Sequence, residues 1–316
     1  MNPTYGMMVQ KVRRVIGVIG IIAPVAAALG CFIGTPAAGA DTEVKTSPVK
    51  AGPQYSTTHV YVAPEDFDRF VVSILATFGG STSPKGVFTV TPTPSKTISQ
   101  LVSTPVGVLS VFGYQTPIPY PFGIERTGYL VADLDAAVQS AAAYGADVVV
   151  APFNDPIGRD AIIVWPGGVH MQLYWHTRPP NHAKLATVPD NRVYVSAARA
   201  NAFVRDFVAF SGSKVASDDR AAPGADIGLP NTLYRHVRLT SDFGNVSVAV
   251  TDGHLPYPYG REITGYAVSD LSETLSKAKA AGSVVLVDPY KFEHGRAAMV
   301  AFPGGYIAEI HSSNGD

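Results

Sequence analysis

His59 is the first residue of this sequence whose type and setting could support chemistry. Side chains alternate between the two faces of a strand, so His59 shares one face with Tyr61, while Val60 and Val62 share the other. If the two valines pack beneath a helix, His59 and Tyr61 face the opposite side of the sheet. An imidazole placed there can act as a metal ligand, or as a hydrogen-bonding group with no metal.

Two arginines offer a different chemistry. The planar guanidinium groups of Arg126 and Arg192 could bind a carboxylate or phosphate of a ligand through two parallel hydrogen bonds. They could instead form internal ion pairs, for example with Glu125. The sequence contains no P-loop, GxGxxG, GxSxG or HExxH pattern, so the nucleotide-binding and hydrolytic sites built on those patterns are not expected.

The composition excludes several classes of protein. Hydrophobic residues make up 46% of the chain, which supplies enough apolar surface to offset chain entropy and rules out disorder as the dominant state. The formal net charge is −1, whereas nucleic-acid-binding proteins normally carry a basic excess, so no nucleic-acid partner is expected. The single cysteine, Cys31, excludes an intramolecular disulfide framework and a multi-cysteine metal site.

The N-terminal segment has the pattern of an export signal. Positive charges at Lys11, Arg13 and Arg14 precede an uncharged apolar run at 15–29, and Ala38-Gly39-Ala40 fits a signal-peptidase site. We therefore expect residues 1–40 to be a signal peptide. The mature protein is then exported, either to the periplasm or to the medium.

Two alternatives to simple cleavage stay open. The apolar run could be an uncleaved membrane anchor, although it is short for a membrane span. Ala28-Leu29-Gly30-Cys31 resembles a bacterial lipobox, in which Cys31 would be lipidated. Residues 41–54 are polar, contain proline and glycine, and are expected to form a flexible N-terminal tail. No later stretch is long and apolar enough to span a membrane, so no span is expected in the mature chain.

The mature chain is a tandem repeat. The segment Pro119-Tyr120-Pro121-Phe122-Gly123 corresponds to Pro256-Tyr257-Pro258-Tyr259-Gly260 at an offset of 137 residues. The same offset relates Gly158-Arg159 to Gly295-Arg296. A register this long without gaps is strong evidence of duplication. The predicted division is a first domain at 55–177, a linker at 178–190 and a second domain at 191–316.

Each copy is itself double. A helical stretch follows Asp133 and another follows Asp270, two residues well suited to N-caps, and these stretches end near Gly145 and Gly282. A short strand precedes each helical stretch, and three short β runs follow it. The pattern predicts an α+β fold of four β-α-β-β-β modules, paired into two domains that each have their own hydrophobic core.

This pattern resembles the vicinal oxygen chelate superfamily, which includes glyoxalase I, bleomycin-resistance proteins and extradiol dioxygenases. The resemblance is carried by GRDAIIVWPGGVHMQLYW at 158–175 and by GRAAMVAFPGGYIAEI at 295–310. It implies that each pair of modules curves into a cup-shaped mixed sheet with a small-molecule site on the concave face. In enzymes of the superfamily the cup holds a divalent metal such as Fe, Mn, Ni or Zn.

The resemblance also implies where metal ligands would lie. The corresponding positions are His59, Ser110, Arg126 and Gln172 in the first copy, and Arg192, Ser247, Ile263 and Glu309 in the second. The metal candidates are therefore His59, Gln172 and Glu309, and the ligand-binding candidates are Tyr61, Arg126, Arg192, Ser110 and Ser247. Neither copy keeps a full set of metal donors. A metal would favour the first copy if Arg126 turned away to an acidic partner such as Glu125.

Three functions follow from these observations. The first is an exported protein of this superfamily that binds a small molecule in a cup, with a largely degenerate set of metal ligands. The alternative is a divalent-metal-dependent lyase, isomerase or dioxygenase-like enzyme with its site in the first domain. The third is a non-catalytic interaction protein in which side chains fill both cups. The sequence leaves open whether the protein is an enzyme.

Overall fold

The computed structural model describes most of the chain beyond the N-terminal segment. The described residues are 52, 56–178, 180–181, 183–292 and 295–312. All elements below belong to one compact unit, Thr46–Asp316. The predicted signal peptide, Cys31 and all of the predicted tail except residue 52 lie outside the described residues. Within the described part of the chain, no helix has both the length and the apolar character needed to cross a membrane.

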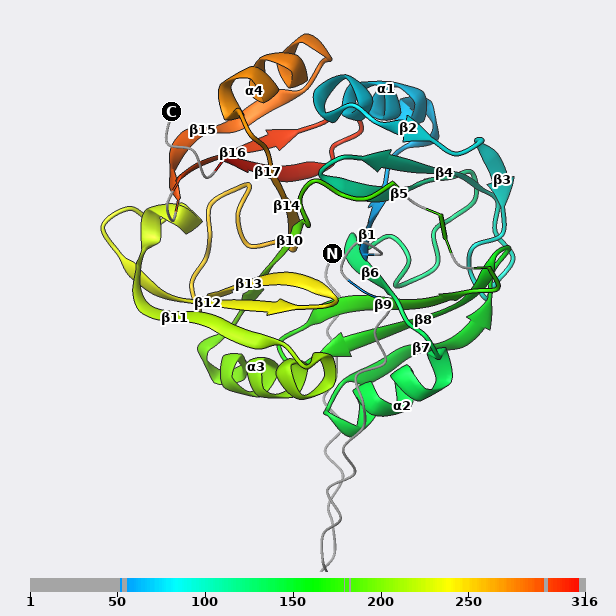
Figure 1. Ribbon diagram of the computed structural model, residues 1–316, viewed down its shortest axis with the longest axis horizontal. Coiled ribbons are helices and arrows are strands. Elements are labelled where there is room, and N and C mark those ends of the chain that lie inside the picture. The colour runs from blue at the N-terminus through cyan, green and yellow to red at the C-terminus, as the bar shows by residue number, and fades with distance from the viewer. Residues whose placement is uncertain (1–51, 53–55, 179, 182, 293–294, 313–316) are drawn as a thin grey trace, which may run out of the picture. The chain divides into compact units, whose positions relative to one another are not determined.

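The first half of the chain forms a nine-stranded mixed sheet. Its strands are β1 (Ser56–Tyr61), β2 (Ser81–Thr82), β3 (Gly86–Phe88), β4 (Thr97–Thr104), β5 (Gly107–Tyr114), β6 (Arg126–Leu130), β7 (Asp147–Asn154), β8 (Gly158–Trp165) and β9 (Val169–His176). Their order is β2-β4-β5-β1-β6-β9-β8-β7, with β3 also paired to β4 (Figure 1). β1 lies parallel to β5 and antiparallel to β6, so the two modules of this half join at β1 and β6.

The second half forms an eight-stranded sheet of the same design. Its strands are β10 (Asp190–Val195), β11 (Lys214–Pro223), β12 (Leu233–Ser241), β13 (Gly244–Val250), β14 (Ile263–Ala267), β15 (Val284–Phe292), β16 (Gly295–Ala301) and β17 (Ile307–Ser312). Their order is β11-β12-β13-β10-β14-β17-β16-β15. β10 lies parallel to β13 and antiparallel to β14. The two sheets confirm the predicted α+β fold of four β-α-β-β-β modules.

One long helix follows the first strand of each module. These helices are α1 (Phe67–Phe78), α2 (Leu134–Ala143), α3 (Ala197–Ser211) and α4 (Leu271–Ala280). The side chain of Asp133 caps α2 by accepting a hydrogen bond from the backbone N–H of Ala136 at 3.0 Å. The side chain of Asp270 caps α4 in the same way, by accepting from the backbone N–H of Glu273 at 2.7 Å. Gly145 and Gly282 follow α2 and α4 with φ of 89° and 86°, a conformation that glycine adopts at least cost. The predicted caps and stops are therefore confirmed.

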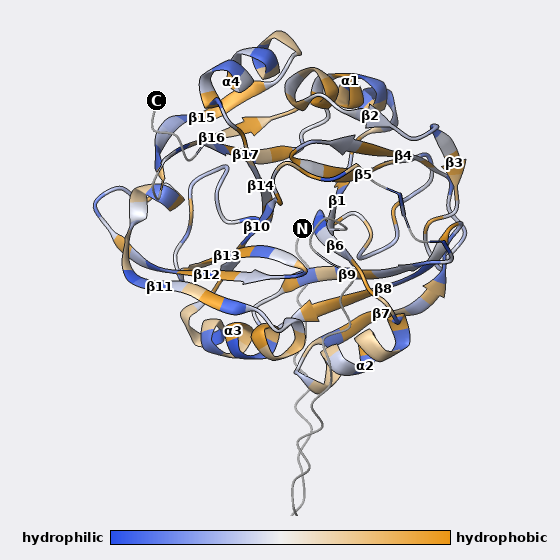
Figure 2. Cartoon of the chain, viewed as in Figure 1, coloured by the Kyte–Doolittle hydropathy of each residue, from blue (hydrophilic) through white to orange (hydrophobic). Residues whose placement is uncertain are grey.

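The part of strand β8 from Ala161 to Trp165 is apolar on both faces, and Figure 2 shows hydrophobic colouring there. Ala161, Ile163 and Trp165 face one hydrophobic cluster, while Ile162 belongs to another cluster with Phe112 on the opposite side. Because side chains alternate along a strand, both faces of the sheet must be covered at β8. The helices cover one face, and the aromatic residues that line the concave face cover the other.

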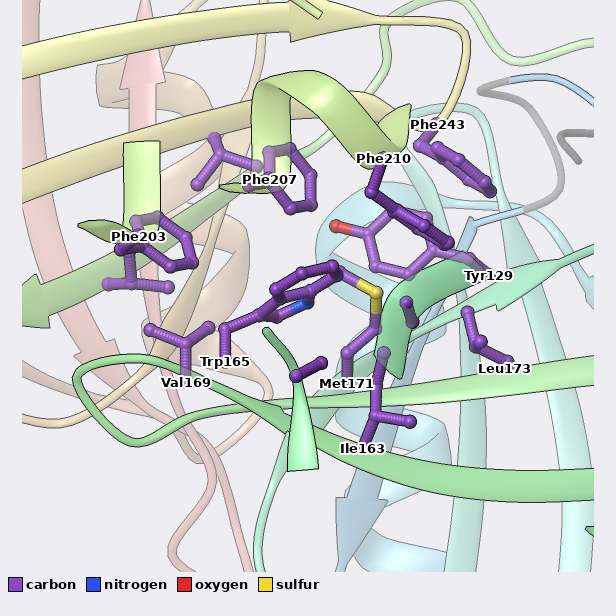
Figure 3. Close-up of a cluster of buried hydrophobic side chains, with 14 of the residues drawn as sticks. Tyr129, Ile163, Trp165, Val169, Met171, Leu173, Phe203, Phe207, Phe210 and Phe243 are labelled. Carbon is purple, nitrogen blue, oxygen red and sulfur yellow. The ribbon is translucent and has the colours of Figure 1, made fainter. Parts of the chain in front are cut away.

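The hydrophobic cores are shared between the two halves, which corrects the expectation of two separately cored domains. One core joins β8 and β9 with α3 and β13, and Figure 3 shows Trp165 lying among Phe203, Phe207 and Phe210. The ring centroids of Trp165 and Phe210 are 5.2 Å apart. Helix α2 buries mainly small side chains, including Ala137 and Ala141, so the aromatic residues of α3 fill the remaining space.

The second shared core joins the first and fourth modules. Phe70 of α1 packs against Tyr306 and Phe302, with ring centroids 5.8 Å and 6.4 Å apart. Polar contacts also cross between the halves. The hydroxyl oxygens of Thr58 and Thr264 lie 2.9 Å apart. The duplication therefore built two sheets, but the apolar surfaces of those sheets are buried against each other's helices.

Candidate functional site

The central strands of the first sheet bring the predicted site residues together. In the strand register His59 pairs with Ser110 on β5 and with Arg126 on β6, and Gln172 on β9 lies beside Gly128 of β6. We call this face of the first sheet the first cup. It holds a cavity of about 260 Å³. Aromatic side chains supply much of its wall, namely Tyr61, Phe88, Phe112, Tyr114, Phe122 and Tyr174.

Arg126 lies in the floor of the first cup and is 2% exposed. Its Nε and Nη2 atoms donate to Oε1 of Gln172 at 3.1 Å and 2.8 Å. Its Nη1 atom donates to the carbonyl oxygens of Pro121 and Ile124 at 3.2 Å and 2.7 Å. The guanidinium carbon lies 5.7 Å from the ring centroid of Tyr61. Arg126 does not pair with Glu125, so that sequence-based expectation is wrong.

His59 is buried in an apolar and cationic setting. Its ring stacks on Phe112, with centroids 5.6 Å apart and planes at 13°. Burial first, and Arg126 second, hold the pKa of His59 well below its usual value. The ring also lies close to β6, since a Cβ added at Gly128 would come within 2.2 Å of Cε1. The imidazole is therefore neutral at pH 7, and its buried Nδ1 atom has no hydrogen-bond partner.

The equivalent face of the second sheet, which we call the second cup, is occupied by an ion pair. Arg192 is buried and pairs with the carboxylate of Glu309, which is 1% exposed. The Tyr290 hydroxyl donates to Glu309 at 3.1 Å, and Nδ1 of His311 lies 3.2 Å from the other carboxylate oxygen. The guanidinium of Arg192 lies 4.7 Å from the ring centroid of Phe292. The polar groups of this cup are therefore bound to one another.

The remaining predicted residues of the second cup also have internal partners. Ser247 lies 2.7 Å from Nε2 of His236, and Ile263 joins an apolar cluster with Met299 and Ile307. The structure therefore divides the predicted residues into two sites. His59, Tyr61, Ser110, Arg126 and Gln172 line the cavity of the first cup, whereas Arg192, Ser247 and Glu309 lie in the second.

Several solved structures similar to this chain are enzymes. A variant of 4-hydroxymandelate synthase from Streptomyces coelicolor matches 85% of this chain and 94% of its own, with 14% identity and a TM-score of 0.55. A variant of homoprotocatechuate 2,3-dioxygenase from Brevibacterium fuscum matches 85% and 73%, with 11% identity and a TM-score of 0.51. The chain has the vicinal oxygen chelate fold.

Other comparisons add little to this result. A Mn(II)-bound glyoxalase from Novosphingobium aromaticivorans covers 82% of this chain and 81% of its own, at 15% identity and a TM-score of 0.47. No protein-family model matches the sequence, and no curated protein matches it. Identities this low establish the vicinal oxygen chelate fold alone, so the function of this chain has to be argued from its own residues.

The metal position of the vicinal oxygen chelate fold does not suit a divalent cation in the first cup. The Arg126 guanidinium donates two hydrogen bonds to the Gln172 oxygen that would bind the metal. A cation already lies at that position, and like charges repel strongly in a poorly solvated site. The described residues also contain no cluster of three or more His, Cys, Asp or Glu side chains able to hold a metal. His59, Ser110 and Gln172, in the positions they occupy here, do not form a site for a divalent cation.

Asp160 on β8 is a cavity residue that the sequence analysis missed. Burial raises the pKa of Asp160 to about 8, Asp155 adds to the rise, and a hydrogen bond with Gln172 opposes it. Asp160 is therefore mainly protonated at pH 7. Strand alternation could have found it, because Ala161 and Ile163 face the shared core and leave Asp160 on the opposite face.

Proposed function

We propose that the protein binds a ring-containing, largely apolar small molecule in the first cup, while the second cup is a structural element. The observation that carries this proposal is the cavity of about 260 Å³ in the first cup. An apolar cavity of about 150 Å³ is large enough to bind benzene. The first cup can therefore take a ring system larger than benzene.

The walls of the first cup have the character of a ligand site. Small-molecule pockets are mostly apolar and aromatic, with a few polar groups that fix the orientation of the ligand. Here Phe112 and Tyr174 provide ring faces, while Ser110, Gln172 and Arg126 provide polar groups. The second cup has these positions filled by the Arg192–Glu309 ion pair and its neighbours. This contrast supports one binding site in each chain.

The two other functions receive less support. A divalent-metal lyase, isomerase or dioxygenase would need donors that the first cup does not present, because a guanidinium lies against Gln172. An interaction protein with both cups filled would leave no room for a ligand, yet the first cup holds a cavity. The proposal that the protein binds a small molecule therefore rests on the difference between the two cups.

The proposal can be tested with a neutral probe and a pair of matched variants. We expect 2-naphthamide to bind the purified protein in isothermal titration, with one site per chain. Tyr61→Ala should weaken binding about tenfold, since it removes an aromatic wall. Tyr194→Ala changes the same repeat position of the second half and should leave binding unchanged. Failure of both 2-naphthamide and its carboxylate analogue 2-naphthoate to bind at 1 mM, or loss of binding in Tyr194→Ala alone, would overturn the proposal.

We also propose that the protein is exported after cleavage of residues 1–40. This is supported by the positive charges before the apolar run at 15–29 and by Ala38-Gly39-Ala40. The mature protein should begin at Asp41 when its intact mass is measured after recovery from the cell envelope or the medium. A species that begins at a lipidated Cys31 would contradict this and indicate a lipoprotein.

A further inference from the structure

The two cups differ in the charge at one repeat position. Gln172 of β9 corresponds to Glu309 of β17 at the offset of 137 residues. In the second cup the Glu309 carboxylate pairs with the buried Arg192. In the first cup the buried arginine is Arg126, and it meets the neutral amide oxygen of Gln172 instead. The second cup therefore contains both members of an ion pair, and the first contains the cation with a neutral partner.

All hydrogen-bond acceptors of Arg126 are uncharged. They are the Gln172 amide oxygen, the backbone carbonyls of Pro121 and Ile124, and the Tyr61 hydroxyl oxygen. Ion pairs among the described residues include Arg192 with Glu309 and Arg159 with Asp135, but none of them includes Arg126. Its charge is balanced by carbonyl dipoles and by the faces of Tyr61 and Phe122, both 5.7 Å away. Two buried acids, Asp160 and Glu262, also interact with Arg126 electrostatically, but burial raises the pKa of each to about 8, so both are mainly protonated at pH 7.

A buried charge without a counter-charge is costly, and a ligand can remove that cost. Taking a guanidinium out of water carries a penalty that dipoles offset only in part. Arg126 is 2% exposed and borders the cavity. Four of the five N–H groups of a guanidinium are used in the bonds to Gln172, Pro121 and Ile124, and the guanidinium also donates to the Tyr61 hydroxyl oxygen. The O–H of Tyr61 can in turn donate to a ligand.

We propose that the ligand of the first cup is an anion: a ring compound with one acidic group, of which a carboxylate is the simplest case. The acidic group binds against Arg126 and supplies the charge that Glu309 supplies to Arg192 in the second cup. The ring of the ligand lies among Phe112, Tyr114 and Tyr174. This inference rests on the proposed function, because it names the class of molecule that occupies the same cavity.

The test compares two probes that differ only in charge. 2-Naphthoate carries a carboxylate, and 2-naphthamide is its neutral isostere. We expect the wild-type protein to bind 2-naphthoate at least tenfold more tightly than 2-naphthamide at pH 7.5, measured by titration calorimetry. The readout is the ratio of the two dissociation constants, which cancels effects of a variant on the cavity as a whole.

Two variants then locate the charge that causes the preference. Gln172→Glu gives the first cup the internal carboxylate that the second cup has, so the ratio should fall to one or below; because Gln172 lines the cavity, the ratio and not either dissociation constant alone is compared with wild type. Arg126→Met should also bring the ratio to one, and a thermal unfolding curve will show whether that variant is folded. Ser247→Ala in the second cup is the control and should keep the wild-type ratio.

Each outcome has a distinct meaning. If neither probe binds, the proposed function fails together with this inference. If both bind equally to the wild-type protein, the proposed function stands and the anionic ligand is wrong. If 2-naphthoate is preferred but the preference survives in Gln172→Glu, the acidic group does not bind at Arg126, and the inference is overturned.

Discussion

At the scale of single residues, one repeat position decides how each cup is used. Glu309 closes the second cup because its carboxylate pairs with Arg192 and accepts from Tyr290. Gln172 cannot neutralise Arg126, so the first cup keeps a buried cation beside its cavity. Glu309 and Gln172 differ only in that one carboxylate oxygen is replaced by an NH2 group. This difference gives the second cup a complete ion pair and leaves the first cup with an unbalanced positive charge.

Glu309→Ala should be strongly destabilising, because it leaves Arg192 as an unpaired buried cation. Breaking a buried pair from one side costs about 3–5 kcal/mol, whereas removing both charges is often near neutral. We therefore expect the double variant Arg192→Met/Glu309→Gln to recover most of the loss, since its glutamine can still accept from Tyr290. Urea unfolding measures the free energy of unfolding of the single and the double variant. Equal stability of the double variant and Glu309→Ala would show that the lost charge pairing is not the cause.

Glu262 should make stability depend on pH. Burial raises the pKa of Glu262 to about 8, although a hydrogen bond with Asn191 partly opposes the rise, and its Oε1 atom has no hydrogen-bond partner. The unfolded chain loses this proton near pH 4.5 and the folded chain only near pH 8. The contribution of Glu262 to stability is therefore full below pH 4.5 and is lost progressively as the pH rises to 8.

Glu262→Gln should flatten this pH dependence. Relative to wild type, the variant should gain stability progressively as the pH rises from 5 to 8, by up to about 4 kcal/mol. Thermal unfolding across that range measures the difference. Some dependence should remain, because burial also raises the pKa of Glu125 to about 7. A wild-type midpoint that rises steadily from pH 5 to pH 8 would contradict the assignment.

At the scale of elements, each helix stabilises more than its own half. Helix α3 of the second half places Phe207 and Phe210 against Trp165 of β8, and α1 packs on residues of the fourth module. A helix covers only part of a sheet, so the uncovered apolar strip is buried by the nearest helix of the other half. Each sheet is therefore made of strands from one half of the chain, but both sheets are stabilised by helices from both halves.

Phe207→Ala should destabilise the half of the chain to which it does not belong. Truncating a buried phenylalanine costs about 3–5 kcal/mol. Both tryptophans, Trp165 and Trp175, lie in the first half, so their fluorescence reports on that half. We expect the tryptophan unfolding midpoint in urea to fall in this variant, together with the midpoint seen by circular dichroism. An unchanged tryptophan midpoint would mean that the halves unfold independently.

At the scale of the whole molecule, the connection between the halves is only partly bound. Ala186 donates its backbone N–H to Pro105 at 2.7 Å, and Thr187 donates to Ala267 at 3.0 Å. Leu185 is 9% exposed, whereas Arg178 and Lys184 are exposed. The stretch 185–189 therefore packs on the protein, and the accessible part of the predicted linker is its N-terminal half.

Limited proteolysis should cut the chain within residues 178–184 and leave the two fragments associated. Proteinase K needs exposed residues, and Arg178, Asn181, Ala183 and Lys184 are exposed. The fragments should still elute together in size-exclusion chromatography, because the two cores are built from both halves. They should separate only in denaturant. Separate elution in native buffer, or a first cut inside one of the sheets, would argue against this arrangement.

The sequence by itself determined the repeat, the four modules and the faces of the strands. Constant spacing fixed which residues occupy equivalent positions, and alternation placed His59 and Tyr61 opposite Val60. These features depend on local backbone geometry, which neighbouring residues encode.

Only the tertiary structure decided the partners of the arginines and the partition of the cores. The sequence offered Glu125 as a partner for Arg126, yet the chain folds so that β6 and β9 lie side by side and Gln172 takes that place. Likewise, the duplication suggested two independent cores, whereas each core draws on both halves. Such contacts join residues far apart in the chain, so they follow from how sheets and helices share buried surface rather than from spacing along the sequence.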